Sequence, residues 1–172
     1  MKRLIIFISL FLMCLTFSAC DPSIYRFNLE ELSENVVNVE LINYDNNEQK
    51  HFQSWVPDRS DKLLPFDNSK ETIIEELNGD KLTDFLNHLS ESDILSQYYA
   101  YDSPKDICIK LSYKNGDFVI ISCNYKEKSF GGYIGKYSSD GKVLEFIGCF
   151  ESYYYYESLV NDYFETKINF EQ

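Results

Sequence analysis

Apolar residues recur along this chain with two different spacings, which separate strands from helices. In residues 36–44 valine and leucine alternate with Asn38 and Glu40, the two-residue period of a half-buried strand. Residues 72–77 fit a strand or a helix, and we favour a strand. In residues 82–89 the apolar positions instead recur every three or four residues, which predicts a helix with one apolar stripe. That stripe consists of Leu82, Phe85, Leu86 and Leu89.

A second stripe of the same kind predicts a helix near the C-terminus, over residues 152–166. Its members are Tyr156, Leu159, Val160, Tyr163 and Phe164. Asn78 or Asp80 is expected to cap the start of the first helix, because a short polar side chain there can accept a hydrogen bond from the first helical turn. Both helices therefore have one face suited to covering a sheet.

The dipeptide Asn115-Gly116 lies between two apolar runs and predicts a β-hairpin with a two-residue turn. With that turn, residues whose numbers sum to 231 lie opposite each other, so Leu111 faces Ile120. The apolar face expected from this register consists of Ile107, Ile109, Leu111, Tyr113, Phe118 and Ile120.

Asp140-Gly141 predicts a second hairpin, with opposed residues summing to 281. The expected pairs are Tyr137 with Leu144, Ile134 with Ile147, and Lys136 with Glu145. Apolar residues then oppose apolar ones and a lysine opposes a glutamate, as stable strand pairs require.

The elements together predict an α+β fold. We expect one antiparallel sheet of about five to seven strands, built of hairpins and a meander, with two helices in a second layer. Residues 57–68 and 95–105 contain prolines and polar residues and are expected to be loops. Such folds support many unrelated functions, so the fold class alone assigns none.

The N-terminus has a different pattern. Lys2 and Arg3 precede an apolar run of 12 residues, Leu4–Leu15, and small residues follow before Cys20. This is the order of an export signal. The run is shorter than the roughly 20 residues that a membrane-spanning helix needs.

The stretch Phe17-Ser18-Ala19-Cys20 resembles the lipobox of bacterial lipoproteins. The resemblance implies that residues 1–19 are removed and that Cys20 carries acyl chains, palmitate among them. It also implies a location on the extracytoplasmic face of the cell membrane. Residues 20–28 would then be a lipidated cysteine with a short tether, and residues 29–172 a single domain. The chain as a whole is similar to the small lipoproteins of Gram-positive bacteria.

Charge narrows the classes of partner. The full chain holds 16 basic and 28 acidic residues, and two of the basic ones lie in the signal. The mature chain thus has 14 basic and 28 acidic residues, a formal charge of −14. We expect no nucleic-acid partner, because phosphate binding requires a basic surface.

Cysteines form the sharpest cluster of reactive residues. In the 231 register Cys108 and Cys123 lie directly opposite each other, and an oxidising compartment would allow a disulfide. Cys149 is a third thiol in the body. The alternatives are buried thiols that act as small apolar residues, a Cys108–Cys123 disulfide, and a redox or metal role, although no CxxC motif is present.

No catalytic motif is found, and we expect no cofactor and no metal site. GxSxG, HExxH, the phosphate-binding loop and the dinucleotide-binding glycine pattern are all missing. His51 has no nucleophile at motif spacing. His88 lies beside the apolar stripe of the first helix, where a boundary or surface position is expected.

Aromatic residues in or near irregular segments are the remaining candidates for a binding surface. They are Trp55, Tyr98, Tyr99 and Tyr101, and exposed aromatic groups often contact proteins, peptides or sugars. The alternative is that they pack loops onto the sheet. Of the run Tyr153–Tyr156, at most about half can face the core of a helical segment.

The sequence therefore predicts a membrane-tethered binding or interaction module, whose partner is an envelope protein, peptide or glycan. Two alternatives stay open. One is a hydrolase acting on envelope material, and the other is a structural or redox-sensing envelope component that uses Cys108 and Cys123.

Overall fold

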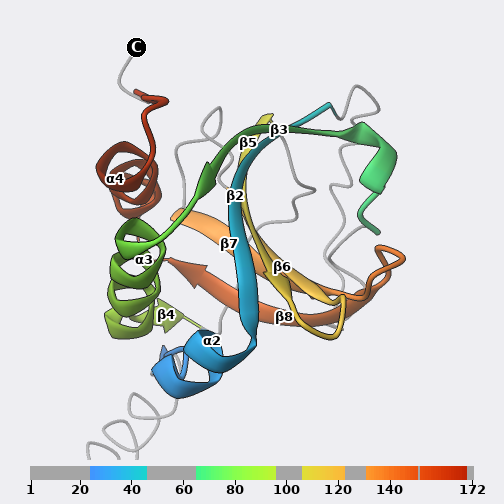
Figure 1. Ribbon diagram of the computed structural model, residues 1–172, viewed down its shortest axis with the longest axis horizontal. Coiled ribbons are helices and arrows are strands. Elements are labelled where there is room, and N and C mark those ends of the chain that lie inside the picture. The colour runs from blue at the N-terminus through green and yellow to red at the C-terminus, as the bar shows by residue number, and fades with distance from the viewer. Residues whose placement is uncertain (1–23, 46–64, 96–105, 123–130, 151, 170–172) are drawn as a thin grey trace, which may run out of the picture.

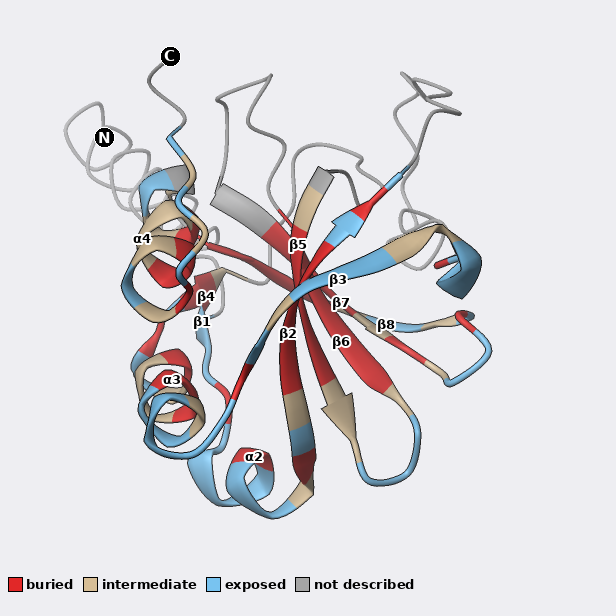
Figure 2. Ribbon diagram, turned by 45° about the horizontal axis from the view of Figure 1, so that its top comes forward, coloured by how far each residue is buried: buried red, intermediate tan, exposed pale blue. Residues whose placement is uncertain are grey.

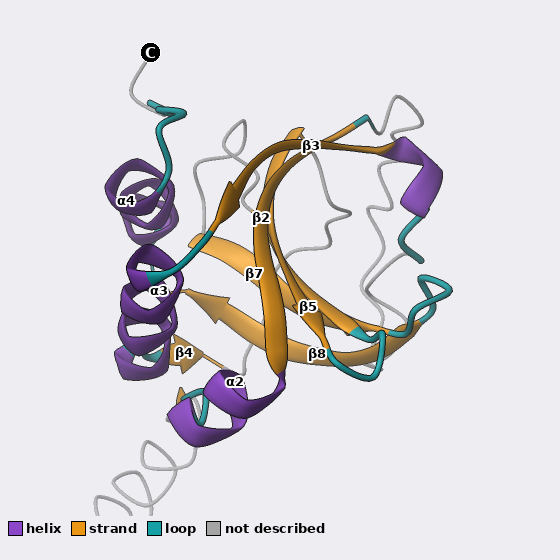
Figure 3. Cartoon of the chain, viewed as in Figure 1, coloured by secondary structure: helices purple, strands orange, loops and turns teal. Residues whose placement is uncertain are grey.

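The computed structural model describes residues 24–45, 65–95, 106–122, 131–150 and 152–169. Within these residues the chain forms one open antiparallel sheet of eight strands together with three α-helices (Figures 1 and 3). The α+β class and the antiparallel sheet are confirmed. The counts of five to seven strands and two helices are too low, because three short elements were not predicted.

The strands are β1 (Ile24–Tyr25), β2 (Val36–Tyr44), β3 (Glu71–Leu77), β4 (Ile94–Leu95), β5 (Asp106–Tyr113), β6 (Phe118–Ser122), β7 (Gly131–Tyr137) and β8 (Val143–Phe150). Their order across the sheet is β1-β4-β8-β7-β6-β5-β2-β3. The helices are α2 (Leu29–Asn35), α3 (Asp80–Glu91) and α4 (Tyr153–Tyr163), and a short 3₁₀ helix, η2 (Asn68–Lys70), precedes β3. β1 and β3 are therefore the two edges of the sheet.

The missed elements are the short ones. α2 has seven residues and buries Leu32 alone, so it shows no apolar stripe. Its start is nevertheless encoded, because the Asn28 side chain accepts a hydrogen bond from the Glu31 backbone at 3.1 Å. β1 and β4 have two residues each, too few for an alternating pattern.

Residues 24–28 belong to the folded body rather than to the expected tether. β1 pairs with β4 and Phe27 is buried in the core. Three residues, 21–23, therefore separate Cys20 from the first strand.

All three α-helices gather on one side of the curved sheet (Figures 1 and 3). The predicted stripe of α3 is confirmed, with Phe85, Leu86 and Leu89 buried in the core between helix and sheet. The predicted cap of this helix is wrong. Gly79 occupies the capping position with φ +59° and offers no side-chain hydrogen bond.

The C-terminal helix is also confirmed. The Ser152 side chain accepts a hydrogen bond from the Tyr154 backbone at the start of α4. Tyr156, Leu159 and Val160 are buried against the sheet, and the Tyr156 hydroxyl donates to the Ile107 carbonyl at 2.7 Å. The exposed ring of Tyr154 agrees with the expectation that only part of the tyrosine run faces the core.

The first hairpin forms between β5 and β6, but its register is one residue away from the prediction. Leu111 lies opposite Val119, and Cys108 lies opposite Ser122. The loop has three residues rather than two: the Gly116 backbone donates to the Tyr113 carbonyl, and Gly116 takes φ +90°. A turn followed by a left-handed glycine is the usual three-residue hairpin loop.

Because of this one-residue difference in register, every side chain of β6 lies on the face of the sheet opposite to the predicted one. Val119 and Ile121 join Ile109 in the core under the helices. Phe118 and Ile120, expected on that face, lie on the opposite face with Cys108.

The second hairpin repeats the same loop type. Gly141 has φ +80°, and its backbone donates to the Ser138 carbonyl. The predicted pair Lys136–Glu145 is confirmed. Tyr137 instead faces Val143, and Ile134 faces Gly148, because the register shifts on either side of that pair.

Candidate functional site

The face of the sheet opposite the helices holds a second cluster of buried side chains, which we call the η2-face cluster. It consists of Ile42, Tyr44, Phe66, Cys108, Phe118, Ile120, Tyr133 and Tyr137. Phe66 lies at its centre, with its ring stacked on Tyr44 at 4.5 Å between centroids and edge-on to Phe118 at 5.2 Å. The segment before η2 thus covers part of this face.

Gly141 holds that segment in place. The Phe66 backbone donates to the Gly141 carbonyl at 2.8 Å. A Cβ atom on Gly141 would lie 1.8 Å from the Phe66 carbonyl oxygen, closer than any real contact. Only glycine allows the β7–β8 loop to approach the segment so closely.

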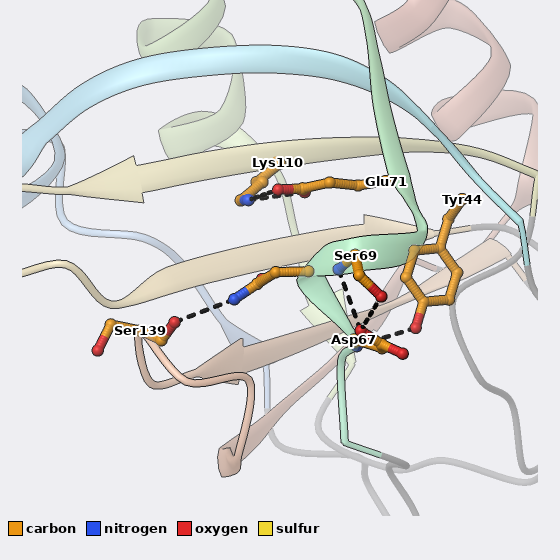
Figure 4. A network of polar contacts seen from close by, with 7 residues as sticks. Tyr44, Asp67, Ser69, Glu71, Lys110 and Ser139 are labelled. Atoms are coloured by element: carbon orange, nitrogen blue, oxygen red, sulfur yellow. Dashed lines mark hydrogen bonds and ion pairs between the residues drawn. The ribbon is translucent and has the colours of Figure 1, made fainter.

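Polar contacts fix η2 beside the ring of Tyr44 (Figure 4). The Asp67 carboxylate accepts hydrogen bonds from the Ser69 backbone at 3.0 Å and from its hydroxyl at 2.7 Å. These bonds hold the pKa of Asp67 below its ordinary value. The Tyr44 hydroxyl accepts from the Asp67 backbone, and the Asn68 amide donates to the Ser139 carbonyl. The start of β3 is therefore well anchored.

Lys110 is the one charged residue in the middle of β5 and lies on the η2 face. Its ammonium group donates to both carboxylate oxygens of Glu71 at 2.7 Å (Figure 4). The side chains are 11% and 20% exposed. The same nitrogen lies 4.7 Å from the ring centroid of Phe118, so an aromatic face completes its surroundings. The pair ties edge strand β3 to the middle of the sheet, across β2.

Acidic groups outnumber this lysine. Glu40 of β2 lies opposite Lys110 on one side and opposite Glu76 of β3 on the other. Glu40 is only 8% exposed. Burial raises its pKa, Glu71 and Glu76 raise it further, and Lys110 acts in the opposite direction. Three carboxylates thus lie near one lysine on this face of the sheet, and of the three Glu71 forms the ion pair with it.

None of the described strands pairs with the outer side of β3. β3 is the last strand of the sheet, and most of its length is exposed (Figure 2). Ile73 is 57% exposed and Ile74 is 42% exposed. Because an edge strand presents unpaired backbone donors and acceptors, this combination provides a surface for another polypeptide.

The strand also has a bulge at this point. Ile42 of β2 faces Ile73 and Leu41 faces Glu75, so Ile74 is an extra residue. Glu75 points to the helix side, where its carboxylate accepts from the backbone N–H groups of Glu165 and Thr166. Glu75 therefore stabilises the segment after α4, whereas Ile73 and Glu76 share the η2 side with Glu40.

The predicted cysteine pair is not formed by direct opposition, because Ser122 lies opposite Cys108. Cys123 lies outside the described residues, so a disulfide between the two stays a prediction. Cys108 is buried in the η2-face cluster. Cys149 is also buried, its thiol donates to the Leu95 carbonyl at 3.8 Å, and burial raises its pKa to about 11.

The other predicted site residues also lie outside the described part of the chain. They are the lipidation site Cys20, the aromatic candidates Trp55, Tyr98, Tyr99 and Tyr101, and His51. Their roles as a lipidation site, a binding surface or a base therefore stay predictions from the sequence.

His88 occupies the boundary position expected for it. It is half-buried between α3 and α4, and its Nδ1 atom lies 2.9 Å from the Tyr163 hydroxyl. Its ring also meets Tyr155 edge-on. His88 thus joins two helices.

Comparison with known proteins provides no relative from which a role could be transferred. No family model, no curated protein and no solved structure matches this chain. In the described ranges, no helix is long and apolar enough to cross a bilayer. No group of three or more metal-ligating side chains occurs there either.

The β3 edge was not predicted as a site from the sequence. One signal was available: Lys110 interrupts the alternating apolar residues of β5 and shares a face with Cys108, which indicates a charge held near a core. Its partner Glu71 could not be identified, because residues far apart in sequence meet here through the sheet order.

Proposed function

We propose that this protein is a lipid-anchored module on the extracytoplasmic face of the cell membrane, and that it binds another protein through the outer edge of β3. The observation that carries the binding role is the exposed edge strand with Ile73 and Ile74 at its surface. Edge strands of stable proteins are usually covered or blocked by charge. Two adjacent exposed isoleucines on such a strand favour contact with a partner.

The anchor is supported by the N-terminal sequence. Lys2 and Arg3, the apolar run and Ser18-Ala19-Cys20 have the order of a lipoprotein signal. Two acyl chains are enough for stable membrane attachment. β1, the strand next to this anchor, lies at the other edge of the sheet from β3. An anchored body would therefore have its binding edge away from the attachment point.

The anchor is tested by mass spectrometry of the mature protein. We expect an N-terminus at Cys20 with a mass increase equal to a diacylglyceryl group, with or without a further acyl chain. Cys20→Ala should remove the lipid and leave the signal uncleaved. A mature N-terminus at another residue, or an unmodified Cys20, would contradict the anchor.

The binding role is tested in intact envelopes with a photo-crosslinking amino acid placed at Ile73 of the full chain. We expect one discrete adduct. The matched control is Val37, which is 54% exposed and so nearly as accessible as Ile73. The absence of an adduct at Ile73, or the same adduct from Val37, would exclude β3 as the binding edge.

A further inference from the structure

The charges around β3 restrict what can pair with it. Glu71 is already bound by Lys110 through both carboxylate oxygens. Glu76 lies opposite the buried Glu40, and within the described residues no ion pair reaches Glu76. Like charges in directly opposed positions destabilise a sheet. A cation beside Glu76 would relieve that repulsion.

We propose that β3 accepts an extended basic segment of another polypeptide as an added strand, with an apolar side chain against Ile73 and a lysine or arginine beside Glu76. This proposal rests on the binding role proposed for the same edge and names the chemistry of the partner. The segment would supply backbone hydrogen bonds along β3, as strand addition does in other peptide-binding domains.

The register of β3 explains the expected pattern of the partner. Glu71, Ile73 and Glu76 lie opposite Tyr44, Ile42 and Glu40 and therefore share one face of the sheet. An added strand that alternates its side chains would present every second residue to that face. On β2 the residues opposite Ile73 and Glu76 are Ile42 and Glu40, which are two positions apart because Ile74 is an extra residue. A partner strand that follows the same register has an apolar residue opposite Ile73 and a basic residue two positions away, beside Glu76.

A second copy of this chain fits less well. When two β3 strands pair antiparallel about Ile73 and Ile74, Glu71 of each copy lies opposite Glu76 of the other. Opposed carboxylates destabilise such a pair, and the formal charge of −12 on each full chain adds repulsion at short range. The surface is therefore better suited to a basic partner than to self-association.

The test uses fluorescence anisotropy with the mature chain in detergent and three labelled peptides. The first, TKTVTKT, alternates basic and apolar residues. The second has glutamate in place of both lysines. The third keeps the basic sequence but is N-methylated at every second residue, which removes backbone donors. We expect the basic peptide to bind at least about tenfold more tightly than the other two.

Two charge-reversal variants complete the design. Glu76→Lys should lower affinity for the basic peptide about tenfold or more, whereas Glu34→Lys, the same change at an exposed position of α2, should not. If both variants lose the same affinity for the basic peptide, or if the methylated peptide binds as tightly as the unmethylated one, binding reflects general attraction between opposite charges. Either result would overturn strand addition. A dimer in sedimentation that Ile73→Lys abolishes would overturn the basic partner in favour of a second copy.

The outcomes separate the two proposals. A discrete crosslink at Ile73 with no preference for the basic peptide would retain the binding role and reject the partner chemistry. No crosslink, together with selective peptide binding, would retain the surface chemistry and reject the role in the envelope.

Discussion

At the scale of single residues, the important feature is an excess of carboxylates around one lysine. Lys110 faces Glu40 in the sheet and binds Glu71 through two hydrogen bonds of 2.7 Å. Both Lys110 and Glu40 are nearly buried. A buried charge costs stability unless it is paired and hydrogen-bonded. Since Lys110 is already engaged by Glu71, Glu40 is the less well compensated member of the cluster.

Glu40→Gln is therefore expected to stabilise the protein at neutral pH. The folded state raises the pKa of Glu40, so ionisation is less favourable in the folded than in the unfolded chain. Protonated Glu40 therefore favours the folded state. This contribution to the free energy of unfolding is fully present below the pKa that Glu40 has in the unfolded chain, about 4.3, and is lost as the pH rises through its higher pKa in the folded chain. Glutamine removes that loss, and we expect a larger free energy of unfolding and a higher melting midpoint than for the parent at pH 7.5.

Denaturant unfolding at pH 7.5 and at about pH 4 measures this effect. The difference between variant and parent should shrink as the pH falls, because Glu40 is then protonated in both states. Glu34→Gln on the exposed surface of α2 removes the same charge and serves as the control. A variant that is less stable than the parent at pH 7.5 would show that Lys110 depends on Glu40 more than on Glu71.

At the scale of elements, the long periodic segments were predictable and the loops that join them were only partly so. β2, α3 and α4 have apolar patterns long enough to identify, whereas residues 72–77, now in β3, fitted a strand or a helix and a strand was only favoured. The dipeptides Asn115-Gly116 and Asp140-Gly141 correctly located both hairpins. Each loop has three residues with glycine last, not two, and this one-residue difference reversed the face of β6.

Those two glycines make a matched pair for a prediction on loop packing. Both have positive φ, so alanine strains the backbone at either site by about 1–2 kcal/mol. At Gly116 the nearest atom to an added Cβ is 3.4 Å away, whereas at Gly141 the Phe66 carbonyl oxygen is 1.8 Å away. We expect Gly141→Ala to lower the free energy of unfolding by about 3 kcal/mol or more, well beyond the loss in Gly116→Ala.

Equilibrium unfolding in urea distinguishes the two variants, and near-ultraviolet circular dichroism reports the aromatic cluster around Phe66. Gly141→Ala should weaken that signal because the segment before η2 must move. Equal stability of the two variants would mean that the β7–β8 loop does not hold this segment.

The candidate site was less predictable from the sequence than the fold, because it depends on how the strands are ordered in the sheet. β3 becomes an edge only through the order of all eight strands. The α3 connection carries the chain from β3 at one edge to β4, next to the other edge. The pattern of residues 71–77 alone does not predict which side of β3 pairs with a neighbouring strand. The exposure of Ile73 and its proximity to Glu40 are thus properties of the sheet order.

At the scale of the whole molecule, the proposed anchor and the proposed binding strand lie at opposite edges of the sheet. Three residues join Cys20 to β1, so Ile24 lies within about 14 Å of the proposed lipidated cysteine. β3 is seven strand spacings away, about 34 Å measured along the sheet. The excess of acidic residues also disfavours close contact between the body and an anionic membrane.

This arrangement predicts that the anchored protein has β1 near the membrane surface and β3 away from it. Fluorophores placed singly at Ile24 and Ile73, which are 60% and 57% exposed, should respond differently to a nitroxide quencher carried on lipid headgroups. In the lipidated protein we expect strong quenching at Ile24 and little at Ile73. A chain that begins at Asp21, without the signal and the lipid, should show no quenching at either position, because only the short link to the lipid holds β1 near the surface. Equal quenching at Ile24 and Ile73 in the lipidated protein would place β3 against the bilayer, where an extended partner strand could not reach it.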